Sequence, residues 1–216
     1  KLLETLNQTS KEEFQTGKIQ LLAQLTRLRQ VCCAPSLVYE DYKGGAAKLD
    51  TCMELIKNAV EGGHKILVFS QFTSLFVLLE KELEKAKIRN YKLTGATAKS
   101  RRAQLVAEFN ENDVPVFLIS LKAGGTGLNL TGASIVIHFD PWWNVAAQNQ
   151  ATDRAHRIGQ KNTVSVYKLI AKNTIEEKIL LLQEAKKNLS DQIISEDGVS
   201  VSNLSKEDFM GILETV

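Results

Sequence analysis

The side chains with the clearest chemical potential lie in the stretch 142–160, WWNVAAQNQATDRAHRIGQ. Gln150, Arg154 and Arg157 are separated there by four and then three residues, a spacing that predicts one shared face of a helix. The apolar run IVIHF ends shortly before this stretch, so the helix is expected at the carboxyl edge of a parallel sheet, where open α/β folds bind ligands. Guanidinium groups present planar, permanently charged donors that match phosphate oxygens. The sequence therefore predicts a phosphate-facing edge.

A glycine-rich turn, LKAGGTGLNL over 121–130, directly follows the apolar run VFLIS. Glycines at such a position allow the backbone to come close to a ligand. The turn is not a phosphate-cradling loop, because the string GxxxxGK followed by Ser or Thr is absent, as is the dinucleotide fingerprint GxGxxG. An acidic box that would hold magnesium is absent as well. The chain thus has phosphate-facing arginines without the parts that grip a nucleotide, which indicates half of a site.

Hydrophobic periodicity predicts the elements that must position these residues. Single helices separate short apolar strands, a pattern typical of a parallel α/β sheet with about five strands. The expected strands are 66–70, 91–93, 116–120, 134–139 and 164–170. The expected helices are 11–33, 48–59, 72–87, 98–110, 145–157 and 175–189, the last with a capping box of Thr174 and Glu177, and a short terminal helix capped by Ser205 and Asp208.

Length and composition set the outer limits of the interpretation. A chain of 216 residues can bury one full core, and length alone favours one domain with an appendage. The sequence has no apolar run of about 18 residues and begins with a polar amphipathic stretch, so nothing points to a membrane or to secretion. Its three cysteines fit neither a disulfide framework nor a CxxC metal site, which favours a reducing interior and no metal ligands.

The net charge of +2 conceals an uneven distribution. Residues 173–216 contain 4 Lys and Arg against 9 Asp and Glu, which leaves 23 against 16 for residues 1–172. Seven bases fall within 85–102, an 18-residue run with no acid. A polyanion would be attracted to such a run, although a basic run is by default a solvated face.

Four strings make a resemblance specific. They are ILVFSQF at 66–72, SLKAGGTGLNLTGAS at 120–134, FDPWWN at 139–144 and QATDRAHRIGQ at 150–160. Together they resemble helicase motifs four, five and six of the Swi/Snf family, the DNA-translocating ATPases of helicase superfamily two. The similarity runs in order over about residues 14–185 and covers only the second of the family's two RecA-like lobes.

The resemblance implies a fold and a division of the chain. We expect an α/β, three-layer α-β-α RecA-like domain with a mostly parallel sheet, an N-terminal helix and C-terminal brace helices. The implied segments are 1–45 as a lead-in between lobes, 46–172 as the helicase C-terminal lobe, and 173–216 as brace helix and tail. The doubled Trp142-Trp143 is more similar to bacterial members than to eukaryotic remodellers. Because the chain begins within a helical pattern, we expect it to be a fragment.

The resemblance also implies roles for single residues. Arg154 and Arg157 match the motif-six arginines, which reach across the cleft between lobes to the ATP phosphates. The ATP cleft would further include Gln150, Gly125, Gly127 and Asn129. Contacts to the DNA backbone would come from Ser70, Gln71, Arg101, Arg102, Ser120 and Lys122, of which Arg102 matches motif four-a. Two departures from the family, Thr94 for the usual Asp and Val145 for the usual Pro, touch none of these roles.

The implied activity belongs to a larger protein. ATP and Mg²⁺ would be bound mainly by an N-terminal RecA-like lobe of the same protein, and double-stranded DNA would be the other partner. We therefore expect a DNA-dependent ATP hydrolase whose C-terminal lobe is inactive by itself. It would work in the cytoplasm at the nucleoid in a bacterium, or in the nucleus of a eukaryote.

Other interpretations stay open. The chain could be a non-catalytic nucleic-acid or protein-binding module that keeps the lobe fold, and an upstream GxxxxGK string with an acidic box would decide between the two. A Rossmann-type nucleotide enzyme is disfavoured by the missing fingerprint. Without the motif, Arg154 and Arg157 would be ordinary surface arginines paired with Asp153 or Glu176. His138 is expected to be a strand residue without a ligand role, and Cys32 and Cys33 are expected to be buried packing residues.

Overall fold

A computed structural model describes residues 11–121, 123, 128–142, 145–153, 155, 163–190 and 204–213 of the chain. Its helices and strands alternate much as the sequence predicts. In chain order they are α2 (Lys11–Cys33), the 3₁₀ turn η1 (Pro35–Leu37), α3 (Ala47–Glu61), β1 (Ile66–Ser70), α4 (Thr73–Lys85), β2 (Asn90–Leu93), α5 (Lys99–Glu111), β3 (Val116–Ser120), β4 (Ile135–His138), α6 (Val145–Thr152), β5 (Ser165–Lys168), α7 (Ile175–Ser190) and α8 (Lys206–Leu213).

The five strands form one sheet in the order β2-β3-β1-β4-β5, and every neighbouring pair is parallel. The apolar runs ILVFS and VFLIS become the central strands β1 and β3, in which every residue is buried. Side chains of successive strand residues alternate between the two faces, so a strand covered on both faces is apolar along most of its length. Ser70 pairs with Ser120 in this register, at the carboxyl end of both strands.

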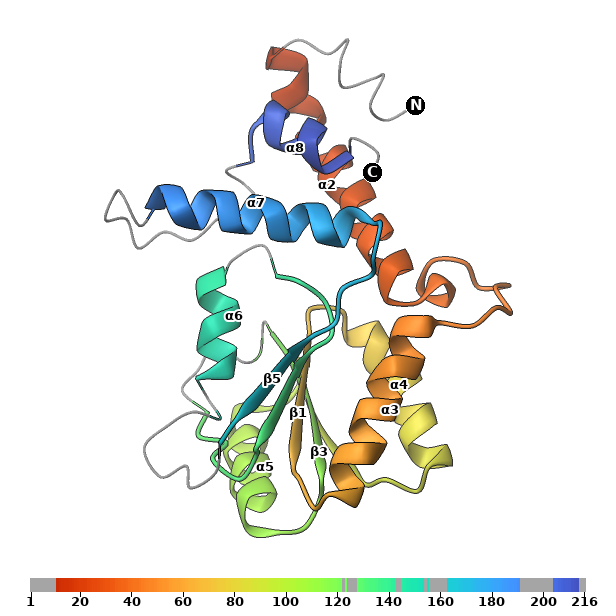
Figure 1. The fold of residues 1–216 in the computed structure, drawn as a ribbon, viewed down its shortest axis with the longest axis vertical. Helices are drawn as coiled ribbons and strands as arrows, with labels where there is room; N and C mark the ends of the chain where they lie inside the picture. Colours follow the sequence, from red (N-terminus) through yellow and green to blue (C-terminus); the bar gives the residue numbers. More distant parts are fainter. Residues whose placement is uncertain are drawn as a thin grey trace.

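Helices cover both faces of the sheet (Figure 1). Buried residues of α3 and α4 share one core cluster with Ile66, Val68 and Ile137. Buried residues of α5 and α6 share a second cluster with Leu67, Phe69 and other side chains from the opposite face. The predicted three-layer α-β-α arrangement with a parallel sheet is therefore confirmed.

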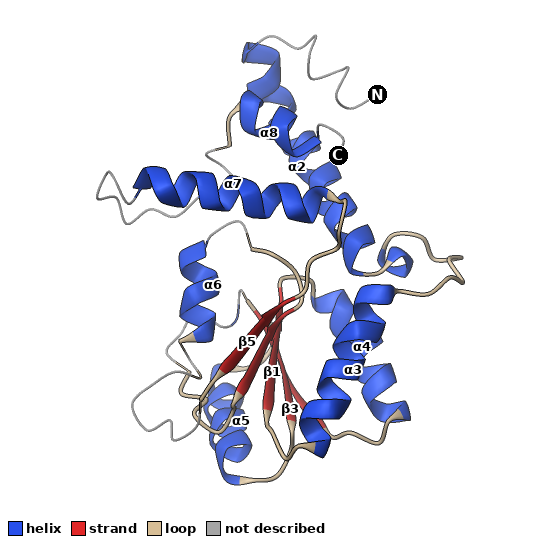
Figure 2. Cartoon of the chain, in the orientation of Figure 1, coloured by secondary structure: helices blue, strands red, loops and turns tan. Residues whose placement is uncertain are grey.

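The remaining helices α2, α7 and α8 form a unit of their own, which we call the helical module (Figure 2). They share a third core cluster in which Phe14 of α2 meets Phe209 of α8 edge to face, with ring centroids 5.5 Å apart. Ile179 of α7 and Leu25 of α2 are buried in the same cluster. The N-terminal and C-terminal helices thus pack on each other, beyond the edge at which the strands end (Figure 1).

The two helix caps predicted from the sequence can be compared with the hydrogen bonds at the starts of α8 and α7. Ser205 and Asp208 form the reciprocal capping box, since each backbone N–H bonds to the side chain of the other residue, at 2.9 and 3.1 Å. At the start of α7 the pattern is shifted, because the hydroxyl of Thr174 accepts the N–H of Glu176 and the carboxylate of Glu177 accepts the N–H of Asn173. Both helix starts are capped, but only the first is a true capping box.

Two elements are shorter than predicted. The last strand spans Ser165–Lys168 rather than 164–170, and all four of its residues are exposed because β4 is its only neighbour in the sheet. Helix α6 ends at Thr152 rather than at 157. Its end is tightened, since the N–H of Ala155 bonds to the carbonyl of Thr152 at 3.0 Å.

Candidate functional site

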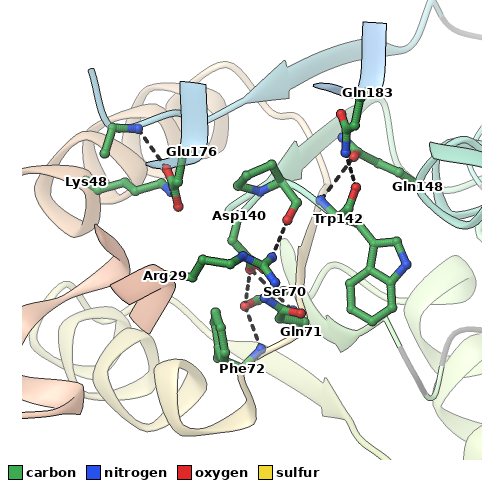
Figure 3. A network of polar contacts seen from close by, with 12 residues as sticks. Arg29, Lys48, Ser70, Gln71, Phe72, Asp140, Trp142, Gln148, Glu176 and Gln183 are labelled. Atoms are coloured by element: carbon green, nitrogen blue, oxygen red, sulfur yellow. Dashed lines mark hydrogen bonds and ion pairs between the residues drawn. The ribbon is translucent and has the colours of Figure 1, made fainter. Parts of the chain in front are cut away.

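The carboxyl ends of β1 and β4 meet in a buried polar network (Figure 3). The hydroxyl of Ser70 donates to Asp140 Oδ1 at 2.5 Å and accepts the backbone N–H of Phe72 at 3.0 Å. The N–H of Gln71 also points to Asp140 Oδ1, at 3.3 Å. Ser70 and Asp140 are 0% and 1% exposed, so the predicted DNA contact of Ser70 has no surface to act through in this arrangement.

Arg29 of α2 enters the same network from the helical module. Its Nη2 lies 3.4 Å from Asp140 Oδ2 and donates to the carbonyl of Pro141, and its guanidinium carbon lies 5.6 Å from the centre of the Phe72 ring. Burial raises the pKa of Asp140, and the charge of Arg29 and the hydrogen bond from Ser70 oppose that rise. The sequence interpretation assigned no role to Arg29 or Asp140.

A second buried ion pair lies beside the first. Lys48 Nζ is 2.6 Å from both carboxylate oxygens of Glu176, and the side chains are 7% and 0% exposed. Glu176 Oε2 also accepts the N–H of Ala171 at 2.8 Å. Burial raises the pKa of Glu176, which the charge of Lys48 opposes. Glu176 is therefore held by α3, and the interpretation of it as a partner for surface arginines is wrong.

The segment 140–142 is fixed further at Trp142. Its N–H points to Gln148 Oε1 of α6 at 3.4 Å, and its carbonyl accepts a hydrogen bond from Gln183 Nε2 of α7. Gln148 and Gln183 are 3% and 8% exposed. The side chain of Gln148 is thus used within the fold.

Helix α6 leads from this segment toward the predicted arginine fingers. Gln150 lies on α6 and is exposed, whereas Arg154 and Arg157 lie outside the described residues. Since α6 ends at Thr152, the continuous helix on which the shared face of Gln150, Arg154 and Arg157 depended is not found, and that geometric argument is corrected.

His138 holds the end of α6. Its Nε2 lies 2.9 Å from the hydroxyl of Thr152, and its ring stacks on Phe69 with centroids 5.6 Å apart. Burial, with a smaller effect of Lys168, lowers the pKa of His138 to about 4, so the ring is neutral at pH 7. The hydroxyl of Thr152 also donates to the carbonyl of Gln148 at 3.3 Å. His138 therefore has a structural role, as the strand residue that fixes the end of α6.

The glycine-rich turn is described only at its ends. Lys122, Gly125 and Gly127 lie outside the described residues. Ser120 is 2% exposed, and its hydroxyl accepts the N–H of Ala123 at 3.2 Å. Asn129 has an exposed side chain, and its carbonyl accepts a hydrogen bond from Asn110 Nδ2 of α5 at 2.8 Å.

The basic run 85–102 is more nearly neutral than its sequence suggests. Four of its seven bases form ion pairs with acids outside the run: Lys85 with Glu82, Arg89 with Asp113, Lys92 with Glu80, and Arg101 with Glu108. Arg102 donates to the carbonyls of Thr97 and Gly95 at 2.8 and 3.1 Å and so supports the loop before α5. The expected attraction for a polyanion is correspondingly weaker.

Within the described part of the chain, no group of three or more His, Cys, Asp or Glu side chains is arranged to hold a metal ion. Asp140, at the carboxyl edge of the sheet, is buried and engaged by Arg29 and Ser70, so it does not fit a magnesium ligand. None of the helices that the structure describes is long and apolar enough to cross a bilayer.

Comparison with known proteins identifies the family. Residues 47–159 match the helicase conserved C-terminal domain. An uncharacterized ATP-dependent helicase of Mycoplasma pneumoniae is 40% identical over 90% of this chain and 19% of its own length, so the chain spans about a fifth of that relative.

Two solved structures from Sulfolobus solfataricus match the whole fold. The SWI2/SNF2 ATPase C-terminal domain is 31% identical with a TM-score of 0.76, and the match covers 100% of this chain and 89% of that one. The SWI2/SNF2 ATPase core in complex with dsDNA is 32% identical with a TM-score of 0.76, over 100% of this chain and 45% of that one. The chain therefore belongs to the helicase conserved C-terminal domain family, as the C-terminal RecA-like lobe of a Swi/Snf-type, superfamily-two ATPase.

Proposed function

We propose that this lobe works in a protein that hydrolyses ATP to move along double-stranded DNA, and that Arg154 and Arg157 are its arginine fingers. The observation that carries the proposal is the position of α6. It follows the segment 140–142 at the carboxyl edge of the sheet, and its last residue, Thr152, is fixed to His138. Arg154 comes two residues after Thr152, which is held by the last residue of β4. The carboxyl ends of the strands are where α/β folds bind ligands.

The role proposed for these arginines is electrostatic stabilisation, which suits a guanidinium group. Phosphoryl transfer builds negative charge on equatorial oxygens, and a guanidinium fork placed there stabilises that charge without giving up a proton. An arginine finger typically contributes about 10³ to 10⁵ in rate. In the proposed cycle, an N-terminal RecA-like lobe of the same protein holds ATP and Mg²⁺, the lobes close, Arg154 and Arg157 approach the phosphates, and hydrolysis allows reopening.

We also propose that one edge of the lobe follows the DNA backbone. Gln71 supports this role, because it directly follows β1 at the carboxyl edge of the sheet and, unlike Ser70, is only partly buried. Lys122, Arg101 and Arg102 would add positive charge. Ser70 contributes by holding Asp140 rather than by touching DNA.

The packing supports a division of the chain into a lobe and a helical module. We propose that 46–172 forms the lobe proper, and that 1–45 and 173–216 together supply the helical module, since α2, α7 and α8 share one core. The protein would act where the DNA is, at the nucleoid of a bacterium or in a eukaryotic nucleus.

The test is Arg157→Ala in the complete protein, with Arg89→Ala as a matched control, because Arg89 lies in an exposed ion pair with Asp113. We expect DNA-stimulated ATP hydrolysis to fall by at least about a thousandfold, with DNA affinity within about twofold of wild type. Wild-type turnover in Arg157→Ala would overturn the proposal. A complete protein that binds DNA and hydrolyses no ATP would instead favour the non-catalytic binding module.

A further inference from the structure

The helical module grips the segment 140–142 through two buried donors (Figure 3). Arg29 of α2 contacts the carboxylate of Asp140 and donates to the carbonyl of Pro141. Gln183 of α7 donates to the carbonyl of Trp142. Two successive backbone carbonyls beyond the end of β4 thus receive their hydrogen bonds from outside the sheet.

These contacts tie the module to the segment firmly. Arg29 and Gln183 are 2% and 8% exposed, and a buried carbonyl that loses its donor has no water to replace it. Their helices share a hydrophobic core, and the buried pair of Lys48 and Glu176 adds a third connection between the helical module and the lobe. The module and the segment should therefore move as one body.

The same segment is linked to α6. The N–H of Trp142 points to Gln148 Oε1, so Trp142 is held by Gln183 on one side and by α6 on the other. At the far end of α6, Thr152 is held by His138. A displacement of α7 would accordingly be transmitted to α6 through Trp142.

We infer that Gln183 and Arg29 are positioning residues for ATP hydrolysis, because they fix through the segment 140–142 where α6 delivers the arginines that follow it. The inference rests on the proposed function and deepens it. Neither residue touches the nucleotide. They set the placement of Arg154 and Arg157, so their loss lowers the rate of the chemical step and leaves ATP binding in place.

Gln183→Leu in the complete protein is the first test, because leucine keeps most of the side-chain volume and removes the donor. Glu184→Leu, on an exposed neighbour in α7, is the matched control. We expect kcat for DNA-stimulated hydrolysis to fall about tenfold in Gln183→Leu, with KM for ATP and DNA affinity within twofold. An unchanged kcat in a folded Gln183→Leu protein overturns the inference.

Arg29→Lys is the second variant, and it protects the test against misfolding. Lysine keeps the charge, but its side chain is one atom shorter than the reach of the Arg29 Nη2 that contacts both Asp140 and the carbonyl of Pro141. We expect the same fall in kcat at unchanged KM. Wild-type kcat in Arg29→Lys argues against a positioning role for Arg29.

A double-mutant cycle separates positioning from a general loss of folded protein. Arg157→Lys is the background, because lysine keeps the positive charge and is expected to retain measurable turnover, and Gln183→Leu is combined with it. If Gln183 acts through the arginines, the second substitution costs less than twofold in that background. If Gln183 only stabilises the fold, the tenfold loss appears in both backgrounds and the inference fails. Wild-type turnover in Arg157→Lys and in Arg157→Ala would instead contradict the proposed function.

Discussion

Arg29 and Asp140 lie 111 residues apart in the sequence, and their charged groups stand 3.4 Å apart where neither side chain is more than 2% exposed. Arg29 comes from the helical module and Asp140 from the loop after β4. Burying a charge is destabilising unless an opposite charge lies close to it. Arg29 and Asp140 therefore each offset the desolvation penalty of the other. The pair is a fixed point between the two parts of the chain.

Removing one partner of the Arg29–Asp140 pair should destabilise the fold. Arg29→Leu leaves Asp140 buried without its counter-charge, and we expect the free energy of unfolding of the 216-residue chain to fall by about 3 to 5 kcal/mol. Urea denaturation measures this. The double variant Arg29→Leu/Asp140→Asn should recover most of the loss, because no uncompensated charge remains. A single variant as stable as wild type would show that the pair is energetically unimportant.

His138 should make stability depend on pH. Its folded-state pKa is lowered to about 4 from an ordinary value of 6.5, so the unfolded chain binds a proton more readily between these values. Its contribution is complete above pH 6.5 and is lost as the pH falls toward 4, by about 3 kcal/mol at most. Unfolding free energies at pH 7.5 and 5 should differ less in His138→Gln than in wild type. Equal differences would exclude His138 as the cause.

The ion pairs of the basic run predict opposite effects of two substitutions on DNA binding. Lys99→Gln removes a base from the run, so the slope of log K against log salt should become shallower by about 1 in a complete protein that binds DNA there. Glu108→Gln releases Arg101 from its ion pair and should raise affinity. If neither substitution changes the slope, the run is a solvated face without DNA contact.

The cysteines should be unreactive in the folded chain. Burial raises the pKa of Cys52 to about 12 and that of Cys33 still further, so almost no thiolate is present at pH 8. Cys32 is partly buried, and burial raises its pKa as well. We expect a disulfide reagent to label the thiols of the native chain far more slowly than those of the urea-unfolded chain. Fast labelling of Cys52 in the native state would contradict its burial.

Much of the fold could be predicted because its signals are local. The runs ILVFS and VFLIS are apolar except for their final serines, and such runs are typical of strands that helices cover on both faces. The end of α6 could not be predicted in this way. No Pro or Gly interrupts the sequence until Gly159, whereas Thr152 is held by His138, a residue that only the folded sheet brings near.

The candidate site shows the same division. The motif strings locate Ser70 and Ser120 correctly at one edge of the sheet, but residue types alone do not reveal that both hydroxyls are used internally. The burial of Arg29 could have been predicted from the sequence, because Arg29 lies on the same face of its helix as Leu22 and Leu25. A charge on an apolar face predicts a buried partner. The acids that neutralise the basic run lie outside it and could not be assigned by counting.

The core of the helical module is assembled from both ends of the chain, since Phe14 and Leu25 pack with Phe209 and Ile212. During synthesis, the sheet and its flanking helices can fold while these early apolar side chains still have no partners. At about 5 to 20 residues per second, α2 waits roughly 10 to 40 seconds for α8 to be made. Helix α8, which is made after α2, therefore completes the burial of the apolar side chains of α2, which stay partly uncovered in the nascent chain until then.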